Sequence, residues 1–249
     1  MNTIFIGKYR IEVEKTDSTN SYTGRLHEEN PLFEGTVVIA KHQEQGRGQR
    51  GTTWESEPNK NLTLSLFLQP GFLPADEQFV LSKTISLGVM EWVASVGVSN
   101  VKIKWPNDIY VGDKKIAGIL IENSVSGTKF QHSIIGVGIN VNQEKFSSHL
   151  SNPTSLKIIT GNEFNLDTCL SQLCFFIEKR YLQLKSHRVG EIDKDYMNAL
   201  YRFGEWGHCT YKHESLTTKI IGVTKNGKLI LQKQDGEKVI CDLKEVGFI

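Results

Sequence analysis

The chain has 249 residues, of which 39% are hydrophobic and 23% are charged, and its formal net charge is +1. This composition is ordinary for a globular protein, and the balanced charge excludes bulk attraction to nucleic acid or membrane surfaces. No run approaches the ~20 apolar residues of a spanning helix, and residues 1–10 hold no apolar run of signal-peptide length. We therefore expect a cytoplasmic protein that does not associate with membranes.

The cysteines and histidines give no sign of a metal centre. The four cysteines form no Cys-x-x-Cys pair, and the seven histidines are scattered without metal-binding spacing. We therefore predict no metal site built from protein side chains, and we expect the thiols to be reduced.

The first hundred residues predict two helices and two strands. N-cap residues cluster at positions 16–20 and predict a short helix that runs towards Asn30. Apolar residues fill positions 36–40, which favours a buried strand, and they alternate over positions 62–68, which favours a half-buried strand. A longer helix, with Gly97 as its C-cap, is indicated by the spacing of Leu81, Ile85, Val89, Trp92 and Val96.

The middle of the chain predicts further strands and one more helix. The Gly112-Asp113 turn makes a hairpin of the two strands beside it, and Gly136 and Gly138 break the last strand. The predicted strands cover residues 101–104, 108–111, 116–122 and 130–141, and the helix covers residues 170–184.

The pattern of apolar residues and glycines changes after Phe203. From Gly207 onwards, short β-rich runs and glycines replace helical spacing, and Asn226-Gly227 between two apolar pairs predicts a tight hairpin. We place a domain boundary here, with one domain over residues 1–203 and a second over residues 204–249. The second domain is expected to be a small SH3-like β-barrel of about five strands.

Residues 46–51 read Gly-Arg-Gly-Gln-Arg-Gly. They match the dinucleotide-binding pattern G-x-G-x-x-G in form, but residues 52–56 are a poor start for the helix that this pattern requires. A flexible surface loop explains the glycines but not the two arginines between them. We therefore predict a loop that closes over a bound anion. Residues 222–228, a P-loop-like stretch without the final Ser or Thr, are predicted to form a hairpin instead.

Residues 104–108 read Lys-Trp-Pro-Asn-Asp, and the proline stiffens a turn that presents Asn107 beside Asp108. Turns of this kind commonly use Asn and Asp side chains for backbone hydrogen bonds. The motif alone therefore favours an ordinary turn over a functional site.

A lysine pair opens the strand that follows the Gly112-Asp113 turn. Alternation places Lys115 on the face of Ala117 and Lys114 on the face of Gly118, but it does not decide which lysine points inward. Paired lysines after a turn are usually both solvated. Gly118 favours a functional site, because a ligand can approach the backbone where no side chain stands.

Two further stretches have competing interpretations. Gly136 and Gly138 weaken their strand unless a ligand or another backbone packs against them, and Asn140 either contacts a ligand or begins a loop. Residues 18–20, Ser-Thr-Asn, either cap a helix, which is the more common role, or recognise a neutral polar ring.

Together and in this order, the motifs resemble biotin–protein ligase, a family that activates biotin with ATP and attaches it to a protein lysine. The matching stretches are residues 17–20, 43–54, 104–108, 115–122 and 136–140. The resemblance implies an α+β fold, with a mixed β-sheet catalytic domain flanked by helices, of the class II synthetase and biotin ligase type. The β-rich tail is similar to the small C-terminal domain of that family.

The resemblance also implies a role for each matching residue. Polar side chains at the first helix would recognise the ring of biotin, and the glycine-rich loop would cover biotin and the adenylate. Lys115 would contact the biotin carboxylate and the α-phosphate, and Asp108 would support the chemistry near magnesium or the incoming lysine. The expected catalytic residues are Lys115, Arg47 and Asp108; the substrate-binding residues are Ser18, Thr19, Asn20, Gln43, Gly46, Arg47, Gly48, Gln49, Lys115, Gly118 and Leu120; and the nucleotide-binding residues are Arg50, Trp54, Asn107 and Asn140.

Two departures from the family pattern carry expectations of their own. The family commonly has arginine at the position of Gln49, so this loop must hold its anion with Arg47 and Arg50, and retention of the activated intermediate is expected to be looser. Some members carry an N-terminal helix-turn-helix that represses transcription. Here the matching begins at Asp17, which leaves no room for one, and we expect no DNA binding.

The implied reaction uses ATP, Mg²⁺ and biotin without a permanently bound cofactor. It modifies a lysine of a biotin carboxyl carrier protein or domain that belongs to a biotin-dependent carboxylase, and the enzyme is either a monomer or a homodimer. The nearest alternative is a lipoate or octanoate ligase, but the Arg-Arg start and Gly-Gly-Gly run of those enzymes are missing. A second alternative is a sensor that binds biotin or adenylate without catalysis.

Overall fold

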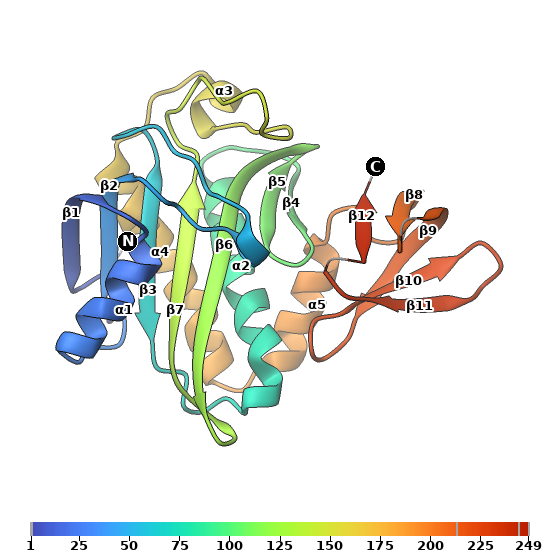
Figure 1. Cartoon of the computed structure of the whole chain (residues 1–249), viewed down its shortest axis with the longest axis horizontal. Coiled ribbons are helices and arrows are strands. Elements are labelled where there is room, and N and C mark those ends of the chain that lie inside the picture. Colours follow the sequence, from blue (N-terminus) through green and yellow to red (C-terminus); the bar gives the residue numbers. More distant parts are fainter. Residues whose placement is uncertain (1, 213, 244, 249) are drawn as a thin grey trace.

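Two β-sheets, the larger one covered by helices, make up the structure (Figure 1). The computed structural model describes residues 2–212, 214–243 and 245–248, and the side chains of Arg50 and Phe248 lie outside the description. Within these ranges, no helix is both long and apolar enough to cross a membrane. The α+β class expected from the sequence is confirmed.

The larger sheet has seven strands in the order β1-β2-β3-β7-β6-β5-β4. Strand β1 pairs with β2 in parallel, and the other neighbouring pairs of this sheet are antiparallel. This order brings β3 beside β7, so stretches far apart in the sequence share one face. The strands are β1 (Arg10–Thr16), β2 (Val37–Gln43), β3 (Leu62–Leu68), β4 (Val101–Lys104), β5 (Asp108–Val111), β6 (Lys114–Ser126) and β7 (Lys129–Ile139).

Helices cover both faces of the larger sheet, with α1 in front of it and α2, α4 and α5 behind it in Figure 1. Helices α1, α2 and α4 match the predicted helices, and Gly97 follows the C-cap of α2 at φ +90°. Helices α3 and α5 are not predicted, because α3 is short and the apolar residues of α5 stand among charged ones. The helices are α1 (Thr19–Glu29), α2 (Gln78–Ser95), α3 (Leu156–Thr160), α4 (Leu166–Lys185) and α5 (Val189–Ala199).

Strand β3 is buried along its whole length, so the predicted half-buried strand is wrong. The alternation separates an apolar face from a polar one, but both faces are covered. Ser65 Oγ and Thr19 Oγ1 of α1 share a hydrogen bond over 2.8 Å, which places the polar face of β3 towards α1. The leucines point to the opposite side, where the other helices lie. The polar positions of β3 therefore face a covered site and not water.

Strand β7 runs without interruption through Gly136 and Gly138, so the predicted break is wrong. Gly138 is paired with Thr63 of β3 on one side and with Gly118 of β6 on the other. Pairing on both sides holds the backbone extended although two side chains are missing.

The second sheet has five antiparallel strands in the order β11-β10-β9-β8-β12, and it lies at the α5 end of the larger sheet in Figure 1. The predicted hairpin at Asn226-Gly227 is confirmed, with Gly227 at φ +88°. Trp105 Nε1 donates to the Gly227 carbonyl over 2.9 Å, so the two sheets are joined at this turn. The boundary between residues 203 and 204 stays a prediction. The strands are β8 (Trp206–Tyr211), β9 (Glu214–Val223), β10 (Leu229–Lys233), β11 (Lys238–Cys241) and β12 (Val246–Phe248).

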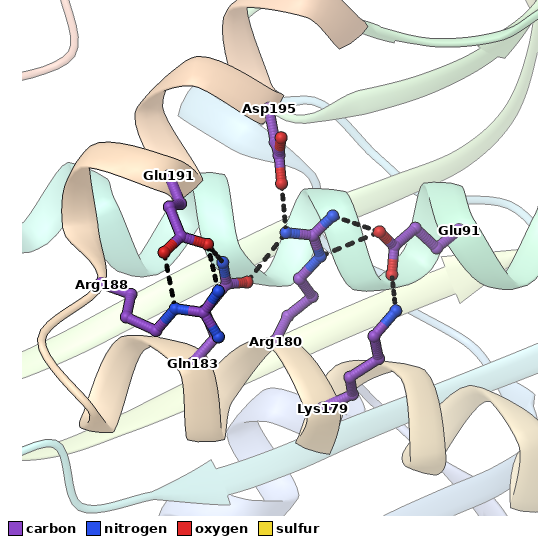
Figure 2. A network of polar contacts seen from close by, with 7 residues as sticks. All are labelled: Glu91, Lys179, Arg180, Gln183, Arg188, Glu191 and Asp195. Carbon is purple, nitrogen blue, oxygen red and sulfur yellow. Dashed lines mark hydrogen bonds and ion pairs between the residues drawn. The ribbon is translucent and has the colours of Figure 1, made fainter.

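Charged side chains join the three long helices behind the sheet, as Figure 2 shows. Arg180 of α4 donates from Nε to Glu91 of α2 over 3.0 Å and from Nη1 to Asp195 of α5 over 2.6 Å. Because Arg180 is buried, removal of either carboxylate would leave its charge poorly compensated. The network fixes the helical layer against which the sheet packs.

Candidate active site

A cavity of about 440 Å³ lies over β3, β7 and β6, on the face of the larger sheet that carries α1. It is bounded by the start of α1, the glycine-rich loop and the 104–108 turn. The fold thus brings together stretches that are scattered along the sequence. The expected site residues that line this cavity are Ser18, Thr19, Asn20, Gln43, Arg47, Gly48, Gln49, Trp54, Asn107, Asp108, Lys115, Gly118 and Leu120.

Glycines form the floor of the cavity, and side chains pack directly on them. A Cβ on Gly138 would lie 2.3 Å from Cε2 of Trp54, and a Cβ on Gly118 would lie 3.1 Å from Cζ3 of the same ring. A Cβ on Gly136 would lie 2.6 Å from Oδ1 of Asn20. The sequence predicted that a ligand or another backbone packs on this strand, whereas the structure places an indole and an amide there. Trp54 Nε1 is buried and has no hydrogen-bond partner among the described residues.

A lysine–aspartate pair stands in the cavity beside Gly118 and the Trp54 ring. Lys115 Nζ lies 2.7 Å from Oδ2 of Asp108 and 5.8 Å from the centroid of the Trp54 ring. Lys104 also lines the cavity, and its Nζ donates to Tyr110 Oη over 3.3 Å. Burial lowers the pKa of Lys104, and the neighbouring charge of Lys115 adds to this effect. Two cationic side chains therefore meet at this end of the cavity.

A bulge in β6 decides which lysine points inward. Lys114 is exposed, whereas the Cε of Lys115 would lie 3.4 Å from a Cβ on Gly118, so Lys115 shares the face of Gly118. The face predicted from alternation is therefore wrong. The reason is a register shift, because Ile109 pairs with Ala117 whereas the next residue, Tyr110, pairs with Lys115.

The loop that leads into α3 also fixes the backbone of Lys115. Its N–H donates to the Asn152 carbonyl over 2.8 Å, and its carbonyl accepts from the Thr154 N–H over 2.9 Å. The lysine is thus held between β5 and the 152–154 segment, which limits how its side chain can enter the cavity.

The 104–108 turn divides its two polar side chains between structure and site. Asn107 Nδ2 donates to the Ile119 carbonyl over 2.6 Å, the backbone role that is common in turns. Tyr196 Oη donates to the Pro106 carbonyl over 2.7 Å and braces the turn from behind. Asp108 is thereby held towards Lys115.

Uncharged polar groups gather where α1 begins. Thr19 N–H donates to Gln43 Oε1 over 2.7 Å, so Gln43 satisfies the first turn of the helix. Ser18 occupies the N-cap position but its side chain makes no capping hydrogen bond. Ser65 Oγ lies 2.8 Å from Thr19 Oγ1 and 2.5 Å from Asn20 Oδ1. Ser18, Thr19 and Asn20 are all buried, which suits recognition of a polar ligand better than capping alone.

The glycine-rich loop folds back on itself as a tight hairpin. Gly48 N–H donates to the Thr52 carbonyl over 2.7 Å, and Trp54 N–H donates to the Gly46 carbonyl over 2.8 Å. A 3-10 turn over Gln49–Gly51 follows Arg47 and Gly48, and no α-helix comes after it in the chain. A dinucleotide-binding loop requires such a helix, so this is not one. The side chain of Arg50, with its expected nucleotide contact, lies outside the description.

Two expected site residues do not line the cavity. Asn140 is buried, and its Nδ2 donates to the Thr154 carbonyl over 3.0 Å, while its Oδ1 has no partner among the described residues. Gly46 lines a neighbouring cavity of about 650 Å³, which shares Arg47 and Gly48 with the first.

Several lining residues were not among the expected site residues. Thr63 had a signal, because it is a polar position in the alternation of β3. Leu243 had none, because it lies in the turn between β11 and β12 and reaches the cavity through tertiary packing alone. The lining residues outside the expected set are Thr52, Thr53, Thr63, Leu64, Lys104, Trp105, Pro106, Ile119, Gly136, Val137, Gly138 and Leu243.

The cavity has a neutral polar end at α1 and a cationic end at Lys115 and Lys104. Such an arrangement fits an acid with a polar, uncharged ring, whose carboxylate lies beside a second anion. In the part of the chain that the structure describes, no group of three or more His, Cys, Asp or Glu side chains could hold a metal ion.

Comparisons with known proteins point to one family. The sequence profile of the biotin/lipoate A/B protein ligase family matches residues 12–140, just over half of the chain. A biotin–[acetyl-CoA-carboxylase] ligase of Paracoccus denitrificans is 28% identical and covers 91% of this chain and 95% of its own length. A bifunctional ligase/repressor BirA of Bacillus spizizenii is also 28% identical, over 96% of this chain and 74% of its own length.

The structural comparison agrees with the sequence comparison. The biotin protein ligase of Aquifex aeolicus, solved in complex with biotin and ATP, superposes with a TM-score of 0.81 at 26% identity. The match covers 97% of this chain and 99% of that one. From the family match, and from the site that the matching residues build, the chain belongs to the biotin/lipoate A/B protein ligase family.

Proposed function

We propose that this protein is a biotin–protein ligase. It activates biotin with ATP to biotinyl-5'-AMP and then transfers biotin to a lysine of a biotin carboxyl carrier protein or domain. The observation that carries the proposal is the Lys115–Asp108 pair at 2.7 Å, beside a glycine floor in a cavity whose other end is lined with hydroxyl and amide groups. The names of the relatives support the same reaction.

The neutral end of the cavity suits the ureido ring of biotin. Ser18 and Thr19 offer buried hydroxyl groups at the cavity, and Asn20 Oδ1 keeps one lone pair, so these residues can exchange hydrogen bonds with a urea group. Gln43 holds the backbone of this turn in place. The apolar parts of the ligand would run past Asn20 and the Trp54 ring, which cover Gly136 and Gly138, towards Lys115.

In the first step, a carboxylate oxygen of biotin attacks the α-phosphorus of ATP and pyrophosphate leaves. Two anions must meet, and at 4 Å in a partly shielded site their repulsion is about 4 kcal/mol. Lys115 would contact both groups, and Lys104, which also lines the cavity, would add charge at the same end. These cations offset the repulsion and stabilise the charge of the transition state.

Mg²⁺ accompanies ATP in the proposed reaction and supplies further charge neutralisation at the phosphates. Asp108 is the cavity carboxylate that could assist such an ion.

In the second step, the amine of the acceptor lysine attacks the acyl carbon and AMP leaves. A lysine amine has an ordinary pKa near ~10.4, so it must lose a proton before it can attack. Asp108 is our candidate to orient that amine, because its carboxylate lies in the cavity beside Lys115. The glycine-rich loop, with Arg47, Gly48 and Gln49 at the cavity, would exclude water from the mixed anhydride.

The test is ATP–pyrophosphate exchange with biotin, lipoate and octanoate as alternative acids. Exchange with biotin alone, followed by biotin transfer to a carrier domain, is the expected result. Exchange with lipoate or octanoate in place of biotin would assign the protein to the lipoate branch of its family. Tight biotin binding without exchange would favour a sensor and contradict the enzymatic proposal.

A further inference from the structure

Glu122, at the end of the 115–122 stretch, has no role in the reaction as proposed above. Its side chain nevertheless joins two parts of the site. Oε2 of Glu122 accepts hydrogen bonds from Nη2 of Arg47 and from Nδ2 of Asn20, each over 2.7 Å. One carboxylate oxygen on β6 thus holds the glycine-rich loop and the start of α1 together.

The contact with Asn20 fixes the orientation of a buried amide. Asn20 Oδ1 accepts from Ser65 Oγ over 2.5 Å and lies against Gly136, while Nδ2 donates to Glu122 and to the Leu120 carbonyl. A carboxylate can only accept hydrogen bonds, so Glu122 requires the NH₂ group on its own side. The carbonyl oxygen of the amide is thereby turned towards β3 and β7.

The contact with Arg47 fastens the loop. Arg47 pairs with Thr53 within the hairpin of the glycine-rich loop, which borders the cavity. A contact that holds the Arg47 side chain therefore restrains the whole hairpin. The guanidinium of Arg47 and the carboxylate of Glu122 are both close to two-fifths exposed. An ion pair at this exposure can open and close, unlike a fully buried one.

We propose that Glu122 is a positioning residue that fastens the glycine-rich loop, through Arg47, over the ring end of the cavity and slows the release of its ligand. The proposal rests on the proposed function, in which the ring end receives biotin. In this arrangement the ion pair of Arg47 with Glu122, called the strap below, holds the loop closed. The positive charge that neutralises the carboxylate and the phosphate comes from Lys115 and Lys104. Loss of Glu122 releases the loop and removes one of the two hydrogen bonds that the Asn20 NH₂ group donates.

The test measures the rate at which labelled biotin leaves the full-length protein after an excess of unlabelled biotin is added. Ion pairs that are partly exposed contribute only modestly to the free energy that holds two groups together. We therefore expect Glu122→Ala to speed biotin release roughly 3–10-fold. Glu122→Gln keeps an acceptor oxygen without the charge and should fall between wild type and Glu122→Ala. The KM for biotin should rise in parallel, while kcat for pyrophosphate release at saturating biotin should stay within about twofold of wild type.

A double-mutant cycle with Arg47→Ala identifies the strap itself. If Glu122 acts through Arg47, the double variant should release biotin no faster than the faster single variant. The matched control is Glu14→Ala, which breaks an exposed ion pair with Lys41 at 2.6 Å, away from the cavity, and should leave release unchanged.

The outcomes separate the two proposals. Unchanged release from Glu122→Ala, or effects of Glu122→Ala and Arg47→Ala that multiply in the double variant, would overturn the strap and leave the proposed function standing. A wild-type protein that binds no biotin at all would overturn the proposed function and the strap with it.

Discussion

Trp54 lies so close to Gly138 that a Cβ on the glycine would be 2.3 Å from Cε2 and 2.5 Å from Nε1 of the indole. Contacts this short force either the ring or the strand to move. Because Gly138 is paired on both sides, the ring is the part that can yield. The position of Trp54 over the cavity therefore depends on the missing side chain.

Gly138→Ala should displace the Trp54 ring and weaken nucleotide binding. Overpacking a tight contact costs about 1–3 kcal/mol, so we expect the KM for ATP to rise about 5–100-fold. Gly190→Ala in α5 is the control, since a Cβ there meets nothing within 4 Å. Steady-state kinetics at varied ATP would check this, and a KM within twofold of wild type would contradict the role given to the contact.

Alkaline pH should destabilise the protein through Tyr110. Burial raises the pKa of Tyr110 from 10.0 to about 12. With the folded pKa above the unfolded one, the stabilising contribution is complete below pH 10 and is lost as pH rises through about 12. The full contribution is at most about 3 kcal/mol.

The measurement for Tyr110 is the free energy of urea unfolding between pH 9 and pH 11.5. Burial also raises the pKa of Tyr181 and Tyr196, so wild type should lose stability steeply. Tyr110→Phe should lose less, with a slope shallower by up to about 1.4 kcal/mol per pH unit. Equal slopes in the two proteins would show that Tyr110 does not titrate as stated.

Gln49→Arg should slow the escape of the activated intermediate. Gln49 lines the cavity, and its carbonyl, not its side chain, holds the 3-10 turn through Thr52, so the substitution leaves the turn intact. The added positive charge should slow escape roughly 3–10-fold at low salt and less at high salt. An intermediate that escapes into solution biotinylates amines of an added protein that is not the acceptor, so the amount of this biotinylation measures the escape. Gln45→Arg adds the same charge outside this cavity, and equal labelling by both variants would contradict the prediction.

Trp105→Phe should loosen the second sheet. The substitution removes the hydrogen bond from Nε1 to the Gly227 carbonyl, worth about 0.5–1.5 kcal/mol. Amide hydrogen exchange at residues 224–228 should become faster. Trp206→Phe is the control, because Trp206 is half exposed on the second sheet. Unchanged exchange at residues 224–228 in Trp105→Phe would mean that the hydrogen bond does not hold the turn.

Local sequence patterns predicted most elements correctly, because helical spacing and turn residues act over short distances. The helix at Thr19–Glu29 and the hairpin at Asn226-Gly227 are examples. Burial was harder to predict, since alternation in β3 separates two kinds of side chain without saying whether water covers either face. Helix α5 was not predicted although Ile192, Tyr196 and Ala199 follow helical spacing, because charged residues stand between these three positions.

In the site, too, features that depend on neighbouring residues were predicted, whereas features that depend on tertiary contacts were not. Residues within matching stretches, such as Asp108 and Lys115, do meet in the structure. The face of Lys115 was missed because one extra residue in β6 reverses the alternation, and a bulge leaves no clear mark in the sequence. Leu243 and the contact between Glu122 and Arg47 depend on tertiary packing, which no local pattern records.

The most direct test of the account is biotin-dependent pyrophosphate release from ATP in wild type, Lys115→Ala and Lys114→Ala. Lys115 faces the cavity whereas its neighbour Lys114 is exposed, so the pair separates site charge from surface charge. We predict release by wild type and Lys114→Ala, and a rate at least ~100-fold lower in Lys115→Ala. Release by Lys115→Ala within threefold of wild type, or no biotin-dependent release by wild type, would contradict the account.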